Sequence, residues 1–142
     1  MRDIKFRIWD GAKNEWLASS DKDALPYYGF ALVGEVMTVQ SPPIWSLDEG
    51  NIVEQFTGLK DKNGTEIYEG DICSFTSKTG KYVGTVEWTG GLAGFGLRMV
   101  KNNFLYTFSE LDTMGVNLDT LKVIGNIHEN PELLEEYGNI NQ

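Results

Sequence analysis

The dipeptide Asn63-Gly64 is the feature of this sequence that most constrains its fold. It separates Ile52–Phe56 from Thr65–Tyr68, two short stretches with β-branched and aromatic residues. Asn-Gly is the strongest short hairpin signal, because both residues accept the positive φ of a type I′ turn. The sequence therefore predicts an antiparallel hairpin that turns at this dipeptide.

Further turn signals recur along the chain after this hairpin, about every ten residues, as is typical of a β-sandwich or barrel. Between them lie strand-like stretches rich in β-branched and aromatic residues. We predict a mainly β fold, an antiparallel pseudo-barrel with an SH3-like, partly open sheet. Its strands are expected at Ile72–Phe75, Tyr82–Trp88, Phe95–Val100, Phe104–Phe108 and Leu121–Ile127.

The two ends of the chain have different patterns. Residues 4–9 alternate apolar and polar positions and break at Asp10-Gly11, which predicts an N-terminal hairpin returning at Glu15–Leu17. Asn130–Gly138 reads as a short helix, with Asn130 as N-cap, Pro131 at the first helical position and Gly138 at its end. Residues 17–50 are less readable, with loops and short strands expected near 30–33 and 36–39.

These elements predict one domain over residues 1–142. Residues 1–50 would form the hairpin and loops, 51–128 the barrel-like core and 130–138 the helix. The single cysteine, Cys73, excludes an intrachain disulfide and a cysteine-based zinc site. The charged N-terminus precedes no apolar run, so no signal peptide is expected, and no window reaches the length of a membrane span. A reducing cytoplasm is the expected location.

The charge of the chain bears on its partners. The formal net charge is −9, which works against non-specific nucleic-acid binding and suits steering of a basic partner. A local basic patch remains open, because six basic residues lie in the second half of the chain: Lys60, Lys62, Lys78, Lys81, Arg98 and Lys101.

No established catalytic or cofactor motif is present in the sequence. The only histidine, His128, lies just before the helix cap and is interpreted as structural. Cys73 alternates within a strand, so a small buried hydrophobe is favoured over a nucleophile. The Asp61–Glu66 segment resembles a calcium loop only superficially, and the glycine-rich Gly90–Gly96 segment precedes a strand, so we interpret both as turns. We predict no catalytic residues, no cofactor and no metal.

Two residue types remain candidates for a site. Trp9, Trp16, Trp45 and Trp88 offer stacking surfaces, although large aromatic residues are more often part of a core. A hydrolase needs two converging carboxylates, and the sequence does not identify which ones converge. The candidates are Glu54, Glu66, Glu69, Asp71, Glu87, Glu110 and Asp112.

Three segments together resemble the YopX-like proteins, a family encoded by bacteriophages and prophages. They are Phe6–Asp10, the long central segment Gln55–Ile72, and Val123–Leu134. The resemblance spans nearly the whole chain and is weakest over residues 17–50. It implies an all-β pseudo-barrel and a location in an infected or lysogenic bacterium. It implies no activity, so no functional residues are carried over.

Three hypotheses for function follow. The first is a non-enzymatic accessory protein that binds a host or phage protein, through sheet edges and loops of the kind that serve recognition. The second is a small nucleic-acid-binding β-barrel that acts in phage replication or regulation. The third is a carboxylate hydrolase, which requires two acids facing each other in a pocket. Homo-oligomers are compatible with each of them.

Overall fold

The computed structural model describes residues 5–18, 30–33, 36–40, 44–45, 51–90 and 94–139. The chain forms two compact units, Lys5–Gln55 and Phe56–Gln142. The protein is mainly β, and its paired strands in the described residues are antiparallel. The predicted fold class is confirmed. None of the helices in these residues has the length and hydropathy of a membrane span.

The predicted N-terminal hairpin is present in the unit Lys5–Gln55. Strand β1 (Phe6–Asp10) pairs with β2 (Glu15–Ala18) on one side and with the first half of β6 (Asn51–Lys60) on the other. The Asp10 carboxylate accepts hydrogen bonds from the amides of Ala12 and Lys13, at 2.9 and 3.2 Å, and this stabilises the turn.

The same unit contains a second, three-stranded sheet in the order β3-β4-β5. Its strands are β3 (Phe30–Val33), β4 (Val36–Gln40) and β5 (Ile44–Trp45). The short strands expected near 30–33 and 36–39 are therefore confirmed. The loops expected around these strands fall on segments that lie outside the described residues.

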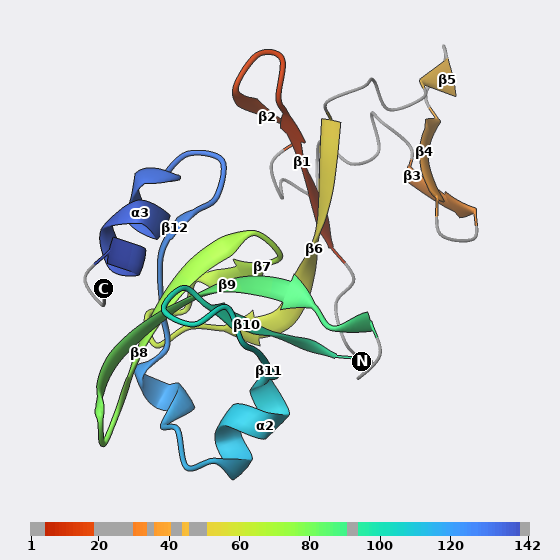
Figure 1. The fold of residues 1–142 in the computed structure, drawn as a ribbon. Helices are drawn as coiled ribbons and strands as arrows, with labels where there is room; N and C mark the ends of the chain where they lie inside the picture. The colour runs from red at the N-terminus through yellow and green to blue at the C-terminus, as the bar shows by residue number, and fades with distance from the viewer. Residues whose placement is uncertain are drawn as a thin grey trace. The chain divides into compact units, whose positions relative to one another are not determined.

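The unit Phe56–Gln142 is built on a five-stranded sheet in the order β11-β10-β9-β8-β12. Figure 1 shows this sheet curling into a half-barrel, which is the partly open sheet predicted from the sequence. The second half of β6 pairs with β7 in the same unit. The strand bounds are β7 (Glu66–Tyr68), β8 (Asp71–Ser77), β9 (Gly80–Trp88), β10 (Phe95–Met99), β11 (Leu105–Thr107) and β12 (Lys122–Asn126).

The hairpin at Asn63-Gly64 is present, but its predicted type I′ turn is wrong. Only Gly64 has positive φ, at +81°. The Asp61 N–H donates to the Thr65 carbonyl at 2.9 Å, and the Gly64 N–H donates to the Asp61 carbonyl at 3.0 Å. This is a three-residue loop with a left-handed glycine. The Asp61 carboxylate causes the difference, because it also accepts the amides of Asn63 and Thr65.

A helix replaces the end of one predicted strand. The expected strand Phe104–Phe108 is shorter, because β11 ends at Thr107 and α2 (Phe108–Thr113) begins directly after it. The short helix η2 (Leu118–Thr120) precedes β12. The C-terminal helix α3 (Glu132–Asn139) is present as predicted, but its predicted ends are wrong. It begins after Pro131, Oδ1 of Asn130 accepts the amide of Asn126 at 3.2 Å, and Gly138 lies within the helix.

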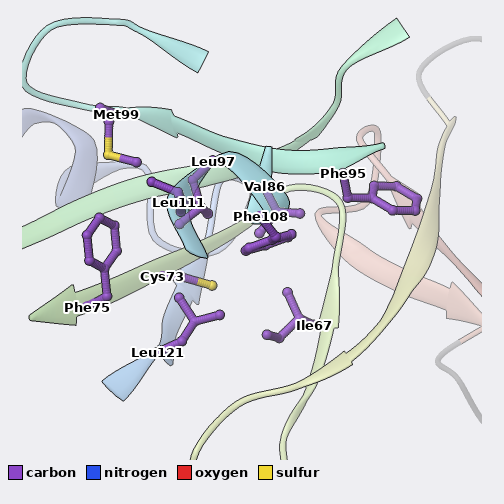
Figure 2. Packing of buried hydrophobic residues seen from close by; sticks show 10 residues of the cluster. All are labelled: Ile67, Cys73, Phe75, Val86, Phe95, Leu97, Met99, Phe108, Leu111 and Leu121. Atoms are coloured by element: carbon purple, nitrogen blue, oxygen red, sulfur yellow. The ribbon is translucent and has the colours of Figure 1, made fainter. Parts of the chain in front are cut away.

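The hydrophobic core of the larger unit lies between the curled sheet and α2. Figure 2 shows Phe108 and Leu111 of α2 pointing into the same space as Val86 and Leu97 of the sheet. The buried cluster contains Ile67, Cys73, Phe75, Val86, Phe95, Leu97, Met99, Phe108, Leu111 and Leu121. Burial of each such side chain contributes roughly 1.5–3 kcal/mol. This packing fixes α2 against the curled sheet.

Candidate binding site

A pocket of about 410 Å³ opens in the larger unit between the β8–β9 hairpin, the end of β10 and α2. A hollow of this size falls within the range of about 300–1,000 Å³ that is usual for ligand sites. The residues that line it come from the five elements β8, β9, β10, β11 and α2 and from the turns between them. They are Phe75, Ser77, Lys78, Thr79, Tyr82, Met99, Lys101, Asn102, Tyr106, Leu111, Met114, Gly115 and Val116.

The wall formed by β8 and β9 combines aromatic rings with hydroxyl groups. The rings of Phe75 and Tyr82 stack with their centroids 5.7 Å apart and their planes at 22°. The Tyr82 hydroxyl lies 2.6 Å from Oγ1 of Thr79, which in turn lies 3.0 Å from Oγ of Ser77. These bonds hold the turn between the two strands, so this wall presents both aromatic rings and hydroxyl groups to the pocket.

The opposite wall is α2, and both of its ends are fixed by local motifs. At its start, Thr107 Oγ1 accepts the Glu110 amide at 3.0 Å, and Glu110 Oε1 accepts the Thr107 amide at 3.1 Å. This is a capping box. At its end, Gly115 has φ +85° and its amide donates to Asp112, while the Val116 amide donates to Leu111. These two bonds form a Schellman motif.

The margin of the pocket carries exposed apolar side chains. Met114 lines the pocket and is 60% exposed. Phe104 is also 60% exposed, and its ring meets that of the pocket residue Tyr106 edge to face at 6.3 Å. The apolar surface of the pocket thus continues outward onto the surface of the unit.

Three of the six candidate basic residues gather around this pocket. Lys78 and Lys101 line it, whereas none of its described lining residues is acidic. A smaller hollow of about 200 Å³ shares Lys101 and Tyr82 with it and adds Lys81. The Nζ atom of Lys81 lies 6.0 Å from the centroid of the Tyr137 ring of α3.

The other three basic residues lie apart from the pocket. The Arg98 guanidinium pairs with Glu87, with 2.5 Å between Nε and Oε2, and this hydrogen bond raises the pKa of Arg98. Lys60 ends β6, and Lys62 lies in the Asp61–Thr65 loop. The predicted basic patch is therefore split, and only half of it borders a hollow.

Most of the candidate carboxylates have identifiable structural roles. Glu54 pairs with Arg7 at 2.9 Å and is buried, and Asp71 accepts the Tyr68 amide at 2.8 Å. Glu87 pairs with Arg98, and Glu110 caps α2. Glu66 and Glu69 are half-buried, and Asp112 is exposed. No three His, Cys, Asp or Glu side chains of the described residues group as metal ligands would.

The remaining sequence candidates lie away from the pocket. Cys73 is fully buried in the core, as its strand position predicted. Burial raises the pKa of its thiol, and the charges of Asp71 and Asp61 add to this. His128 is half-buried, and its backbone N–H donates to Oδ1 of Asn126 at 3.0 Å.

The tryptophans do not form a common stacking surface in the described residues. Trp9 is buried and meets Trp16 edge to face at 5.0 Å, with the Arg7 guanidinium 4.4 Å from the centre of the Trp16 ring. Trp88 is 47% exposed and packs against Phe95. The side chain of Trp45 lies outside the described residues. The strands β9 and β10 on either side of the glycine-rich segment pair antiparallel, and residues 91–93 within it lie outside the described residues.

Sequence reasoning missed the wall formed by α2, although its signals are present. Thr107-Phe-Ser-Glu110 has the spacing of a capping box, and Met114-Gly115-Val116 has the glycine of a Schellman motif. Six residues between these signals are enough for the short helix that is observed.

Comparison with known proteins establishes the family. The family model described as YopX protein matches residues 5–135, so the chain belongs to the YopX protein family. The resemblance seen in the sequence is confirmed. No curated protein matches the sequence.

Two solved structures have a similar fold. The crystal structure of protein EF1440 from Enterococcus faecalis has a TM-score of 0.57 and 28% sequence identity, and the match covers 94% of this chain and 99% of that one. The structure of protein yopX from Bacillus subtilis has a TM-score of 0.52 and 20% identity, covering 94% of this chain and 98% of that one. These matches support the fold and indicate no biochemical function.

Proposed function

We propose that this protein is a phage- or prophage-encoded accessory protein that acts as a non-enzymatic protein-binding module. Its binding site is the pocket between the β8–β9 hairpin and α2. The observation that carries the proposal is the continuity of this pocket with the exposed side chains of Met114 and Phe104. A partner protein would insert one large apolar side chain and cover the margin.

The energetics of protein interfaces favour this arrangement. Binding energy is concentrated in a few anchor side chains that fill well-packed pockets, surrounded by contacts that exclude water. The pocket offers an aromatic wall at Phe75 and Tyr82 and an aliphatic one at Leu111 and Val116. Exposed Met and aromatic side chains at the margin are the residue types enriched in interface cores.

The non-enzymatic role is supported by the structural use of the candidate carboxylates. A hydrolase needs two acids that face each other in a cleft. Glu54 and Glu87 are engaged by arginines, and Glu110 caps a helix. The lining of the pocket carries no acid.

The deciding experiment combines capture with a pocket variant. The full chain captures proteins from infected or lysogenic cells, and each candidate is then purified and titrated by calorimetry. Met114→Gln should weaken binding about fivefold or more, because loss of an important interface side chain costs upward of about 1 kcal/mol. Leu59→Gln is the matched control, because Leu59 is 41% exposed and does not line the pocket. A partner that binds both variants as tightly as wild type would argue against the pocket.

A second candidate function is binding of single-stranded nucleic acid. Lys78, Lys81 and Lys101 adjoin the rings of Tyr82 and Tyr137. Basic side chains beside aromatic rings are typical of surfaces that bind single strands. Fluorescence anisotropy with labelled DNA and RNA oligonucleotides at 50 and 200 mM salt tests this candidate, since phosphate contacts make affinity fall steeply with salt. Absence of salt-sensitive binding would remove it.

A further inference from the structure

We infer that the segment seated in this pocket is an acidic peptide, with one large apolar side chain in the hollow and neighbouring Asp or Glu residues against Lys78 and Lys101. The inference rests on the proposed function and names the chemistry of its partner. It follows from the charges that surround the pocket.

The charged residues that line the pocket have the opposite sign to the net charge of the chain. The protein has 21 acidic and 12 basic residues, yet the lining contains two lysines and no carboxylate. The adjoining hollow adds Lys81 and again no acid. A surface of one sign raises the local concentration of ligands of the other sign and rejects ligands of its own.

The two lysines have no ion-pair partner among the described residues, and this separates them from both arginines described above. Arg7 pairs with Glu54 and Arg98 with Glu87, at 2.9 and 2.5 Å. Lys78 and Lys101 form no such pair. Their ammonium groups are therefore available to a ligand.

The lysines come from two different turns, and this sets where the carboxylates of a ligand would lie. Lys78 lies in the turn between β8 and β9, and Lys101 follows β10. Both line a pocket whose lining also includes the buried apolar side chains of Met99 and Leu111. An aliphatic or aromatic side chain of the ligand would pack against these two residues, while carboxylates on either side of it would meet the two turns.

The same features favour a peptide over a nucleic acid. A net charge of −9 opposes a polyphosphate, whereas a short peptide carries only a few charges. The apolar residues that line the pocket suit an apolar protein side chain, whereas nucleic-acid bases would need an open aromatic surface on which to stack.

Selection from a random peptide library displayed on phage tests the inference. The full chain is the bait, and enriched peptides are synthesised and titrated against wild type and variants. We expect peptides with an aromatic or large aliphatic residue next to Asp or Glu. The double variant Lys78→Glu/Lys101→Glu should bind them roughly tenfold more weakly, and high salt should weaken wild-type binding.

The control has the same change in charge elsewhere. Lys13 and Lys122 are exposed and do not line the pocket, so Lys13→Glu/Lys122→Glu should bind the peptides within about twofold of wild type. Circular dichroism verifies that each variant is folded.

The outcomes separate the inference from the proposed function. Suppose that the selected peptides need Met114 but are neutral or basic, or bind the Lys78→Glu/Lys101→Glu variant as tightly as wild type. Either result would overturn the acidic peptide and leave the proposed protein-binding module intact. Recovery of no peptide that depends on Met114 would overturn both. An oligonucleotide that displaces the peptides and binds more tightly through the same lysines would replace the peptide with nucleic acid.

Discussion

The carboxylate of Asp61 accepts a 2.9 Å hydrogen bond from the backbone N–H of Val123, 62 positions further along the chain. Its other oxygen accepts the amides of Asn63 and Thr65. The Lys62 amide also donates to the carbonyl of Leu121 at 3.0 Å. One buried side chain thus fixes the β6–β7 loop and ties it to the edge strand β12.

Asp61→Ala should therefore destabilise the protein by about 3 kcal/mol, because three backbone amides lose a charged acceptor and one of them joins distant segments. Urea denaturation measures this as a fall in the midpoint at constant m-value. Asp112→Ala is the control, since Asp112 is exposed, and it should change stability by less than about 0.5 kcal/mol. Equal effects of the two substitutions would show that the link to Val123 contributes nothing.

The same carboxylate makes stability depend on pH. Burial acts to raise the pKa of Asp61, but the hydrogen bonds from Val123, Thr65 and Asn63 outweigh it and hold the pKa below the ordinary value of 3.8. The folded state therefore binds this proton less readily than the unfolded state. The resulting stability is fully present above the ordinary pKa and is lost as pH falls through the lower folded-state pKa.

Asp61→Asn removes this titration. The difference in unfolding free energy between wild type and Asp61→Asn should be constant above about pH 5 and should shrink as pH falls below about 4. Urea titrations at a series of pH values from about 2 to 7 measure it. A difference that stays constant down to the lowest pH would contradict a lowered pKa.

The Asn63-Gly64 loop illustrates how far the sequence predicts this fold. Turn residues and alternating apolar residues are local signals, so the hairpin, the strands of the half-barrel and the C-terminal helix were all predictable. The form of the loop was missed, although Asp61 gives a local signal for it, because its carboxylate accepts the nearby amides of Asn63 and Thr65. The hydrogen bond from Val123 to the same carboxylate joins residues distant in sequence and leaves no local signal.

The candidate site was less predictable than the fold. Its wall at α2 follows from the capping box at Thr107 and Glu110, which is a local signal. Its opposite wall follows from the pairing of β8 with β9, which places Phe75 against Tyr82. The meeting of the two walls depends on core packing around Leu111, so the sequence showed the lysines without showing the pocket between them.

Two glycines should respond to alanine in opposite directions. A Cβ atom at Gly96 would lie 2.7 Å from the Thr107 Cα and would also collide with the Tyr106 carbonyl oxygen, both backbone atoms of the neighbouring strand. Gly96→Ala should therefore cost at least about 3 kcal/mol. Gly138 lies in α3, and its nearest contact would be Val100 at 3.5 Å, so Gly138→Ala should raise stability by about 0.5–1 kcal/mol.

Thermal unfolding followed by circular dichroism measures both changes. Should Gly96→Ala fail to fold, Gly84→Ala provides a milder step, because its Cβ would meet Leu97 and Arg98 atoms at 3.0 and 3.1 Å. The expected order of melting temperature is Gly138→Ala, wild type, Gly84→Ala, Gly96→Ala. A Gly96→Ala protein as stable as wild type would contradict the close approach of β10 and β11.

The thiol of Cys73 should be unreactive in the folded protein. The side chain is fully buried, and burial raises its pKa, so little thiolate is present and reagents have no access. Labelling with a thiol-specific disulfide reagent at pH 8 should be complete in urea, whereas without denaturant its rate should follow unfolding of the chain. Rapid and stoichiometric labelling of the folded protein would show that this strand opens locally.

The capping box connects the stability of α2 with binding at the pocket. Thr107→Ala removes the hydroxyl that accepts the Glu110 amide and should cost about 1 kcal/mol in unfolding free energy. Glu110→Ala removes the reciprocal bond, and the two substitutions should be non-additive by about 0.5 kcal/mol or more, because they break one shared motif. Urea denaturation of both single variants and the double variant measures this coupling.

The same substitution should affect binding at the pocket, because α2 carries Leu111 and is followed by Met114. Thr107→Ala should weaken the binding of peptides that depend on the pocket, whereas Ser109→Ala, at an exposed position of the same helix, should not. Additive stabilities with unchanged peptide affinity would show that α2 is held in place by its core contacts alone.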